Sequence, residues 1–452
     1  MMNCTGKPGY NDKYFSTNQT AARRSMNAQS IISAIETENF TGKIRDLYGS
    51  SLSVEKQKER YRNVTSGFAR RFGDTGDIRI YSAPGRTEIG GNHTDHQHGR
   101  VLAAAVNADI ICAASPCDEE RVTVVSEGFG EFSLSLADLE PREENYGKTE
   151  ALIAGVFGAM KSRGYKIGGF KGYMSSQVPG GSGLSSSAAF EILIGYIISE
   201  MFNNSAVSAV ELAEMGQFSE NVFFGKPCGL MDQMACAQGG LCQFDFADPS
   251  HPEIIPVNVD LGAIPYDIAI TETGGSHEDL TDEYAAVPLE MKGVAQMFGE
   301  EYLKNVTGDM LLEKCGEIRE KLGDRAFLRA VHFVNETKRA AAEAAALEKG
   351  DMDGFMELFR RSGHSSWELL QNVSVCSDPV NQPVAVAIAV SRQILGDDGG
   401  YARVHGGGFA GTIQAFVRKE LSEKYRDKMD QIFGEGTCHI LEIRKYGGIR
   451  VL

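Results

Sequence analysis

Four titratable side chains lie within six residues of one short stretch. The stretch runs from Gly85 to Gly99, GRTEIGGNHTDHQHG, and holds His93, Asp95, His96 and His98. Imidazole and carboxylate groups bind metals, but they also hydrogen-bond hydroxylated organic ligands. Adjacent residues of an extended loop point to opposite sides, so three ligands on one ion would need a special bend. The pattern therefore favours contact with an organic ligand over a metal site, with a purely structural turn as the plain alternative.

A second stretch, PGGSGLSSSAAFEILIG from Pro179 to Gly195, has the composition of a phosphate cradle. Glycines let the backbone approach a ligand, and the helix that follows presents free N–H groups and a positive dipole end. Serines on the first turn can hydrogen-bond phosphate oxygens or bind Mg²⁺. No Gly-Lys-Ser/Thr follows, so this is not a Walker A loop, and a glycine-rich turn with serine caps is the plain alternative. The candidate nucleotide-binding residues are Gly180, Gly181, Ser182, Gly183, Leu184, Ser185, Ser186 and Ser187.

A third glycine-rich stretch, HGGGFAGTIQAFV, begins at His405. Its Gly406, Gly408 and Gly411 fit the GxGxxG pattern of dinucleotide-binding folds. That pattern requires a helix after the glycines, whereas TIQAFV is typical of a strand. The stretch therefore predicts a turn that packs closely beneath another loop, and an NAD site is disfavoured.

The elements that must position these loops can be outlined from periodicity. The first 75 or so residues are polar with apolar residues at helical spacing, which predicts an N-terminal helical extension. Residues 78–86 predict a strand that ends at Pro84–Gly85, and the serines of the second loop open a helix. Helices and strands then follow on both sides of a predicted domain boundary near Pro252–Gly262. The predicted class is mixed α+β with two lobes.

Composition excludes several classes of protein. The chain has 45 Lys and Arg against 61 Asp and Glu, a net charge of -16, which argues against nucleic acid or an anionic membrane as a partner. Nine cysteines without a CxxC pair argue against a disulfide framework or zinc ribbon. The N-terminus lacks the apolar core of a signal peptide, and the longest apolar stretch is interrupted by Asn107 and Asp109. We therefore expect a cytoplasmic protein.

The three loops, taken in order, resemble the signatures of the GHMP small-molecule kinases, and within them of the galactokinases. APGRTEIGGNHTDH (83–96) is similar to the family's sugar-binding signature, and PGGSGLSSSAA (179–189) to its nucleotide-phosphate loop. GGGFAGT (406–412) is similar to the third motif. Between them, CGLMDQ (228–233) resembles the segment that carries the catalytic aspartate. The resemblance covers roughly residues 76 to 452.

The resemblance implies a two-lobed GHMP kinase fold of class α+β. Its N-terminal lobe would be like domain 2 of ribosomal protein S5, its C-terminal lobe would be ferredoxin-like, and an N-terminal helical extension would precede both. The implied domains are an extension over 1–75, an N-terminal domain with the sugar and phosphate loops over 76–258, and a C-terminal domain over 259–452. The expected partner is a small-molecule sugar, without nucleic acid or membrane, on a monomer or weak homo-oligomer. The resemblance gives residues 1–75 no role.

The activity implied is ATP- and Mg²⁺-dependent phosphorylation of the anomeric hydroxyl of galactose, giving galactose 1-phosphate. Asp232 would accept the hydroxyl proton, and Arg86 beside it would keep that carboxylate ionised and steady the transferring phosphoryl group. Glu220 and Ser187 would hold Mg²⁺, although the choice between Ser186 and Ser187 stays open. The residues implied in sugar binding are Asn92, His93, Asp95, Gly229 and Tyr284.

Two departures from the family concern the substrate. The family usually has glutamate, facing the O6 end of the sugar, where this chain has Asn92, and tyrosine where it has His96. An amide there would tolerate a 6-carboxylate or a sugar without the 6-hydroxyl. The alternatives are therefore the same chemistry on galacturonate, arabinose or N-acetylgalactosamine. A catalytically silent galactose- and ATP-sensing regulator is a further alternative, which retention of Arg86 and Asp232 disfavours.

Overall fold

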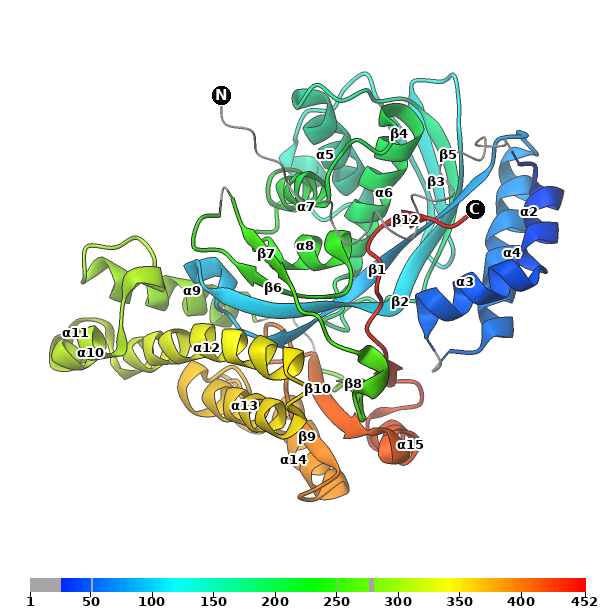
Figure 1. Cartoon of the computed structure of the whole chain (residues 1–452). Coiled ribbons are helices and arrows are strands. Elements are labelled where there is room, and N and C mark those ends of the chain that lie inside the picture. Colours follow the sequence, from blue (N-terminus) through cyan, green and yellow to red (C-terminus); the bar gives the residue numbers. More distant parts are fainter. Residues whose placement is uncertain (1–25, 50–51, 250, 276–279) are drawn as a thin grey trace.

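The computed structural model describes residues 26–49, 52–249, 251–275 and 280–452. Residues 1–25 of the predicted extension lie outside the described residues. The strands form two sheets, each covered by helices, in two lobes (Figure 1). The predicted α+β class with two lobes is therefore confirmed. No described helix is long and apolar enough to cross a membrane.

The first lobe is built on the larger sheet. Its path runs β12-β1-β2-β5-β3-β4, with β6 and β7 added beside β2. All its pairs are antiparallel except β3 with β5. The strands are β1 (Arg79–Gly90), β2 (Arg100–Pro116), β3 (Arg121–Ser126), β4 (Gly130–Ser135), β5 (Phe170–Ser176), β6 (Leu241–Asp245), β7 (Glu253–Pro256) and β12 (Ile449–Arg450).

Helices cover the two faces of this sheet with separate apolar cores. One face carries α5 (Thr149–Ser162), α6 (Ser186–Asn203), α7 (Ala209–Phe218) and α8 (Met231–Gln238). The other carries α2 (Ala28–Ile35), α3 (Glu38–Tyr48) and α4 (Val54–Phe72), which stand together at the edge of the molecule in Figure 1. The α6 helix is apolar on nearly all sides because it is buried along most of its length.

The N-terminal helices begin at local signals in the sequence. Asn27, Thr37 and Ser53 are the N-caps of α2, α3 and α4, and each side chain accepts a hydrogen bond from a backbone N–H of the first turn. Their apolar residues pack against β1 and β2, with Ile80 and Ile111 fully buried. The described part of the predicted extension is thus an integral layer of the first lobe.

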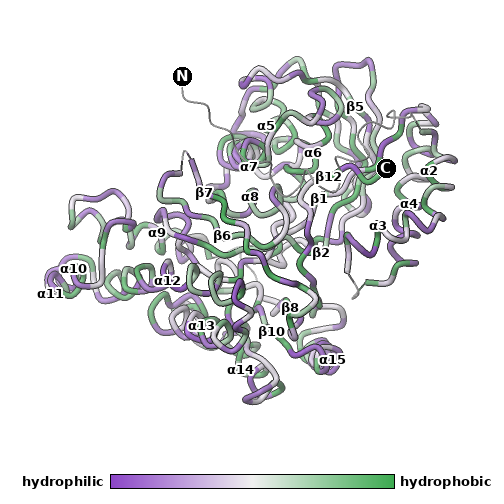
Figure 2. Tube along the Cα trace, viewed as in Figure 1, coloured by the Kyte–Doolittle hydropathy of each residue, from purple (hydrophilic) through white to green (hydrophobic). Residues whose placement is uncertain are grey.

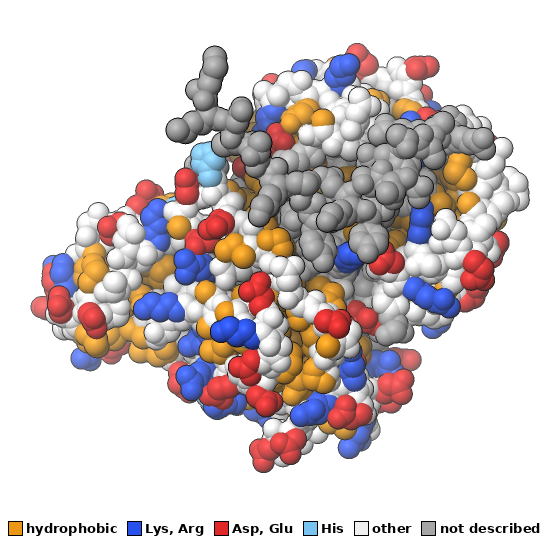
Figure 3. Space-filling model, viewed as in Figure 1, with side chains coloured by type: hydrophobic (Ala, Val, Ile, Leu, Met, Phe, Trp, Pro, Cys, Tyr) orange, Lys and Arg blue, Asp and Glu red, His pale blue; other side chains and the backbone are white. Residues whose placement is uncertain are grey.

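The second lobe is built on the smaller antiparallel sheet, in the order β11-β8-β10-β9. Hydrophobic and hydrophilic residues alternate along its outer helices, as in amphipathic helices (Figure 2). Acidic and basic side chains are interspersed over the face in Figure 3. Its strands are β8 (Tyr266–Glu272), β9 (Gly400–Val404), β10 (Thr412–Arg418) and β11 (Cys438–Leu441), and its helices are α9 (Thr281–Gln296), α10 (Gly308–Glu313), α11 (Cys315–Leu322), α12 (Asp324–Glu348), α13 (Met352–Ser365), α14 (Pro383–Leu395) and α15 (Ser422–Phe433).

The C-terminal segment returns to the first lobe. The chain changes sheet between Pro256 and Tyr266. After β11, however, Arg444 N donates to Ala105 O at 2.8 Å, and β12 pairs with β1. Residues assigned by sequence to the C-terminal domain thus complete the sheet of the first lobe.

One predicted strand end is wrong. β1 does not stop at Pro84–Gly85 but continues to Gly90, so Arg86 lies within a strand rather than in a loop. Its pairing with β2 shifts register between Pro84 and Arg86, and again between Glu88 and Gly90. These irregularities let the strand pass through a proline and a glycine that sequence patterns assign to a turn.

A buried carboxylate joins the N-terminal helices, the sheet and the C-terminal segment. Asp109 on β2 is fully buried, and its Oδ1 lies 2.5 Å from Arg60 Nη1 of α4. Its Oδ2 accepts hydrogen bonds from Arg444 Nη1 at 2.9 Å, from Tyr48 Oη at 2.7 Å and from Ser82 Oγ. Burial opposes ionisation of Asp109, but the two arginines outweigh it and hold its pKa below the usual value.

We expect Asp109→Asn to lower the free energy of unfolding by about 3–5 kcal/mol, because it leaves two buried guanidinium groups without their counter-charge. Denaturant unfolding of the full chain measures this. The matched control is Asp324→Asn, which removes an exposed ion pair with Arg319 and is expected to cost less than about 1 kcal/mol. Equal losses in the two variants would contradict the assignment.

Candidate active site

Arg86 and Asp232 form a bidentate ion pair at the centre of the candidate site. Arg86 Nε lies 2.7 Å from Asp232 Oδ1, and Nη2 lies 2.5 Å from Oδ2. Arg86 reaches this position from β1, and Asp232 from the first turn of α8. The Arg86 side chain is almost buried, whereas the Asp232 side chain keeps 25% of its surface exposed. The carboxylate is therefore fixed and still accessible.

The charge state of Asp232 follows from these contacts. Burial disfavours its ionised form, but the Arg86 guanidinium and a hydrogen bond from Ser185 Oγ at 2.7 Å outweigh burial. Together they hold the Asp232 pKa below its usual range. Asp232 is thus an ionised, hydrogen-bond-accepting carboxylate at neutral pH.

The phosphate loop, residues 179–187, is attached to the same arginine. Arg86 Nη1 donates to Gly183 O, and the Arg86 backbone N–H donates to Leu184 O at 3.0 Å. Gly181 and Gly183 have positive φ values of 77° and 72°, which glycine adopts without strain. Ser185 has φ 57° as the N-cap of α6, an uncommon conformation for a residue with a side chain, and it turns its hydroxyl toward Asp232.

The exposed middle of the loop opens on the N-terminus of α6. Gly180 and Gly181 are exposed, and a Cβ atom at either position would meet nothing within 4 Å. Ser186 and Ser187 are half-buried in the first turn of α6, where free backbone N–H groups attract anions. Ser182 is buried and its hydroxyl donates to Pro179 O at 2.8 Å, so this serine stabilises the loop itself.

A hydroxyl and a carboxylate lie side by side next to this loop. Ser187 Oγ is 3.0 Å from Glu220 Oε1, and Lys226 Nζ is 3.2 Å from the same oxygen. Glu220 projects from a π-helical turn, η4 (Ser219–Phe223), that continues α7. Its other oxygen accepts a hydrogen bond from Gln233 Nε2 at 2.9 Å. The pair supplies two oxygen ligands of the kind that Mg²⁺ prefers.

Gln233 and Glu191 are parts of this arrangement that the sequence did not reveal. Gln233 Nε2 also donates to Glu191 Oε2 at 3.1 Å, and Glu191 is only 1% exposed. Burial, and secondarily the nearby Glu220, raise the Glu191 pKa well above its usual value. Such a residue looks like an ordinary helix position in sequence, because its partners come from other helices.

Asp95 and Gly229 are brought together as the resemblance implied. Asp95 lies on a single 3₁₀ turn, η2 (Asp95–Gln97), and its carboxylate occupies the space where a side chain at 229 would be. Gly229 is thus required for Asp95 to approach the Arg86–Asp232 pair. Burial, and secondarily Asp232, raise the Asp95 pKa to about 6.

Asn92 does not face an open site, contrary to the expectation from sequence. Its side chain is 0% exposed, and its Nδ2 donates to Gly406 O at 2.7 Å and to Glu88 Oε2 at 3.2 Å. Its Oδ1 accepts hydrogen bonds from Asn372 Nδ2 at 3.0 Å and Ser366 Oγ at 3.3 Å. Because protein groups satisfy the whole amide, Asn92 holds the two lobes together rather than presenting a group to a ligand.

The histidines of the same stretch form a chain of neutral hydrogen bonds. Gln97 Nε2 lies 3.4 Å from His96 Nδ1, His96 Nε2 lies 3.3 Å from His93 Nδ1, and His93 Nε2 lies 2.9 Å from Gly407 O. Burial lowers the pKa of His93 to about 4 and that of His96 to about 3. Both ring nitrogens of His93 thus have protein partners.

A metal site at these histidines finds no support. Among the described residues, no group of three or more His, Cys, Asp and Glu side chains could hold a metal ion. His98 stacks on Tyr302 of the second lobe, with ring centroids 3.8 Å apart.

The third glycine loop packs beneath the loop of residues 91–99, which we call the sugar loop, as predicted. Gly406 O and Gly407 O accept the hydrogen bonds of Asn92 and His93, and Tyr284 Oη donates to Gly408 O at 2.6 Å. Tyr284 is half-buried, its ring edge-on to Phe409. Its phenol lies on the glycine loop beside the sugar loop.

Comparison with known proteins identifies the family of this chain. Residues 66–116 match the galactokinase galactose-binding signature, and residues 151–240 match the N-terminal domain of GHMP kinases. The galactokinase of Actinobacillus pleuropneumoniae serotype 3 (strain JL03) is 32% identical over 370 residues, which cover 80% of this chain and 91% of that protein. The galactokinase of Clostridium tetani (strain Massachusetts / E88) is 29% identical over 374 residues, 81% of this chain and 91% of that protein.

Solved structures share the fold. The Lactococcus lactis galactokinase complexed with galactose superposes with a TM-score of 0.73 at 24% identity, covering 85% of this chain and 98% of that one. The Methanococcus jannaschii mevalonate kinase superposes with a TM-score of 0.57 at 15% identity, covering 82% and 99%. The expected GHMP kinase fold is thereby confirmed, and the chain belongs to the galactokinase family.

Proposed function

We propose that the protein transfers the terminal phosphoryl group of ATP to the anomeric hydroxyl of galactose. The observation that carries this proposal is the placement of the ionised Asp232. Arg86 fixes this carboxylate, and Ser185 of the phosphate loop donates a hydrogen bond to it. A carboxylate in this position can accept the proton of a sugar hydroxyl while that oxygen attacks the phosphoryl group. The similarity to galactokinases supports galactose as the sugar.

Arg86 has two tasks in this proposal. Its charge keeps Asp232 ionised, and its position between Asp232 and Gly183 places a permanent positive charge between base and phosphates. That charge offsets the negative charge that develops on the oxygens during transfer. Because the arginine is bidentate to Asp232 and also bonded to the loop, it keeps base and loop at a fixed separation.

Ser187 and Glu220 are the residues that we expect to hold Mg²⁺. Their oxygens, 3.0 Å apart, fit a cation that prefers hydroxyl and carboxylate ligands and keeps several waters. When bound there, the ion would supply positive charge that offsets the negative charge of the phosphates. Lys226, which is ion-paired with Glu220, is placed to do the same from the solvent side.

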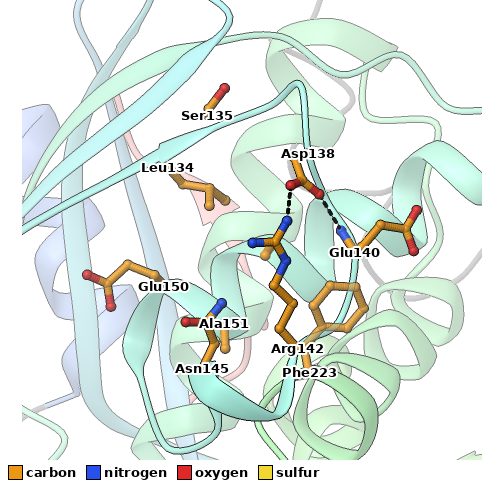
Figure 4. Close-up of a pocket in the computed structure, with 10 residues that line it drawn as sticks. Leu134, Ser135, Asp138, Glu140, Arg142, Asn145, Glu150, Ala151 and Phe223 are labelled. Atoms are coloured by element: carbon orange, nitrogen blue, oxygen red, sulfur yellow. Dashed lines mark hydrogen bonds and ion pairs between the residues drawn. The ribbon is translucent and has the colours of Figure 1, made fainter.

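A cavity of about 240 Å³ between the segment that follows β4 and the start of α5 is a candidate site for the nucleotide base. Phe223, three residues beyond Glu220, forms one wall, and Leu134, Ala151 and Ala154 supply further apolar surface. Figure 4 shows Arg142 extending across this cavity beside the Phe223 ring and toward Asp138. A planar base could pack against these apolar side chains while polar groups at the rim contact its edge.

Asp95 is the side chain that we expect to read the ring hydroxyls of the sugar. Its ionised carboxylate can accept two hydrogen bonds next to the backbone of Gly229. With Asp232 it places two carboxylates at the sugar site, which disfavours an anionic sugar such as galacturonate. Because Asn92 is buried, the identity of residue 92 does not argue for a different sugar.

We predict that galactose is the preferred substrate in a coupled spectrophotometric assay with ATP and Mg²⁺. Galacturonate, arabinose and N-acetylgalactosamine serve as the comparison panel. A kcat/KM for galacturonate well above that for galactose would contradict the proposed substrate. Absence of turnover with every sugar, with galactose still bound, would favour the silent regulator.

Asp232→Asn is expected to lower kcat at least ~100-fold, the usual scale for loss of a general base, while galactose still binds. Steady-state kinetics with calorimetric sugar titration separates the two effects. Asp245→Asn is the matched control, because Asp245 pairs with Arg100 at the edge of the sheet. A variant at 232 with full activity would overturn the mechanism.

The Asp95 pKa of about 6 predicts a pH dependence for the use of galactose. Below pH 6 Asp95 is protonated and loses acceptor capacity, so kcat/KM for galactose should fall toward tenfold per pH unit. Asp232 stays ionised in this range because its pKa lies below the usual value. A pH profile of kcat/KM at saturating ATP checks this, and Asp95→Asn should remove the acid limb. An acid limb of unchanged midpoint in that variant would refute the assignment.

A further inference from the structure

The N-terminal helices contact the phosphate loop at its first end. Gln177 is the residue that follows β5, two positions before Pro179. Its backbone N–H donates to Asp109 O at 2.8 Å. Its Oε1 accepts hydrogen bonds from Arg60 Nη1 at 3.0 Å and from Gln57 Nε2 at 3.1 Å, both on α4. The residue at the start of the loop is therefore hydrogen-bonded to helix α4, which packs on the sheet.

Arg60 is itself rigidly held. Its guanidinium contacts Asp109 twice, through Oδ1 at 2.5 Å and the backbone oxygen at 2.8 Å. It also donates to Ser175 O, the second-last residue of β5, at 2.8 Å. The guanidinium is almost buried and lies between β2 and the last residues of β5 before the loop. A planar, permanently charged guanidinium with this many partners is held in one orientation. The Gln177 side chain that it binds is therefore held in one orientation too.

Arginines thus hold both ends of the phosphate loop. At the far end, Arg86 bonds Gly183 O and Leu184 O. Between the two anchors, Gly180 and Gly181 are exposed and free of close neighbours. A glycine-rich segment pays a large conformational entropy when a ligand orders it, and fixing its ends reduces that cost.

We propose that Arg60 and Gln177 are positioning residues for nucleotide binding, through which α4 fixes the start of the phosphate loop. The proposal rests on the proposed function, because the ligand of the loop is taken to be the ATP phosphates. Neither residue touches the reacting atoms. Their effect is on nucleotide affinity, because they preorganise the loop before the phosphates arrive. The N-terminal helices then have a role in the activity beyond covering the sheet.

The test is Gln177→Ala in the full chain, measured with Mg²⁺ and a non-hydrolysable ATP analogue by calorimetry and with ATP by kinetics. Loss of the two side-chain hydrogen bonds is expected to raise the nucleotide Kd and the KM for ATP by about tenfold. The KM for galactose and kcat should stay within about twofold. Gln177→Glu, whose carboxylate still accepts from Arg60, should restore nucleotide affinity.

Arg62→Ala is the matched control, because Arg62 lies on the same helix but, among the residues that the structure describes, its side chain forms ion pairs only with the exposed Glu36 and Glu55. It should leave both KM values unchanged. Gln177 is exposed, so its substitution should leave the melting temperature nearly unchanged. An unchanged nucleotide Kd in Gln177→Ala, or equal rises in the KM values for ATP and galactose, would overturn the proposal. A wild-type chain that binds no ATP analogue would instead overturn the proposed function.

Discussion

The ion pair between Arg86 and Asp232 is the constraint on which the site depends. A guanidinium group is planar and always charged, so two parallel bonds to one carboxylate fix the relative placement of β1 and α8. The same side chain reaches Gly183 O and thereby includes the phosphate loop in one rigid unit. The carboxylate that we propose as proton acceptor and the loop that we propose as phosphate cradle come from segments almost 50 residues apart in sequence, and one arginine contacts both.

The second constraint is the meeting of the sugar loop with the third glycine loop. Gly406, Gly407 and Gly408 present successive carbonyl oxygens, which can only accept hydrogen bonds, so their partners must be donors. This explains Asn92. Its amide faces both Gly406 O and the Glu88 carboxylate, and a glutamate at 92 would place acceptor against acceptor. The residue at 92 is set by Glu88 and the neighbouring loop rather than by the substrate.

Local sequence patterns predicted the features that depend on neighbouring residues, namely where helices and strands begin. The serine-rich start of α6 and the strand after the third glycine loop were evident from composition and periodicity. The resemblance placed Arg86 beside Asp232. The continuation of β1 beyond Pro84 was missed, because a proline and a glycine together are typical of a turn, and only pairing with β2 shows the register shift. The burial of Asn92 was missed because three of its partners, Ser366, Asn372 and Gly406, lie 274 to 314 residues further along the chain.

Comparison of Asp109 with Asp232 shows how solvent exposure decides the role of an Arg–Asp ion pair. In the sequence, this carboxylate only interrupts an apolar run. A charge in a buried strand is costly unless it is paired, so arginine partners could be expected, but not which of them. The phosphate loop now lies between two Arg–Asp pairs, Arg60 with Asp109 and Arg86 with Asp232. Asp109 is fully enclosed, so it can only hold structure in place. Asp232 keeps a quarter of its side-chain surface exposed, and that exposure is what our proposal requires of a carboxylate that accepts a proton from a substrate.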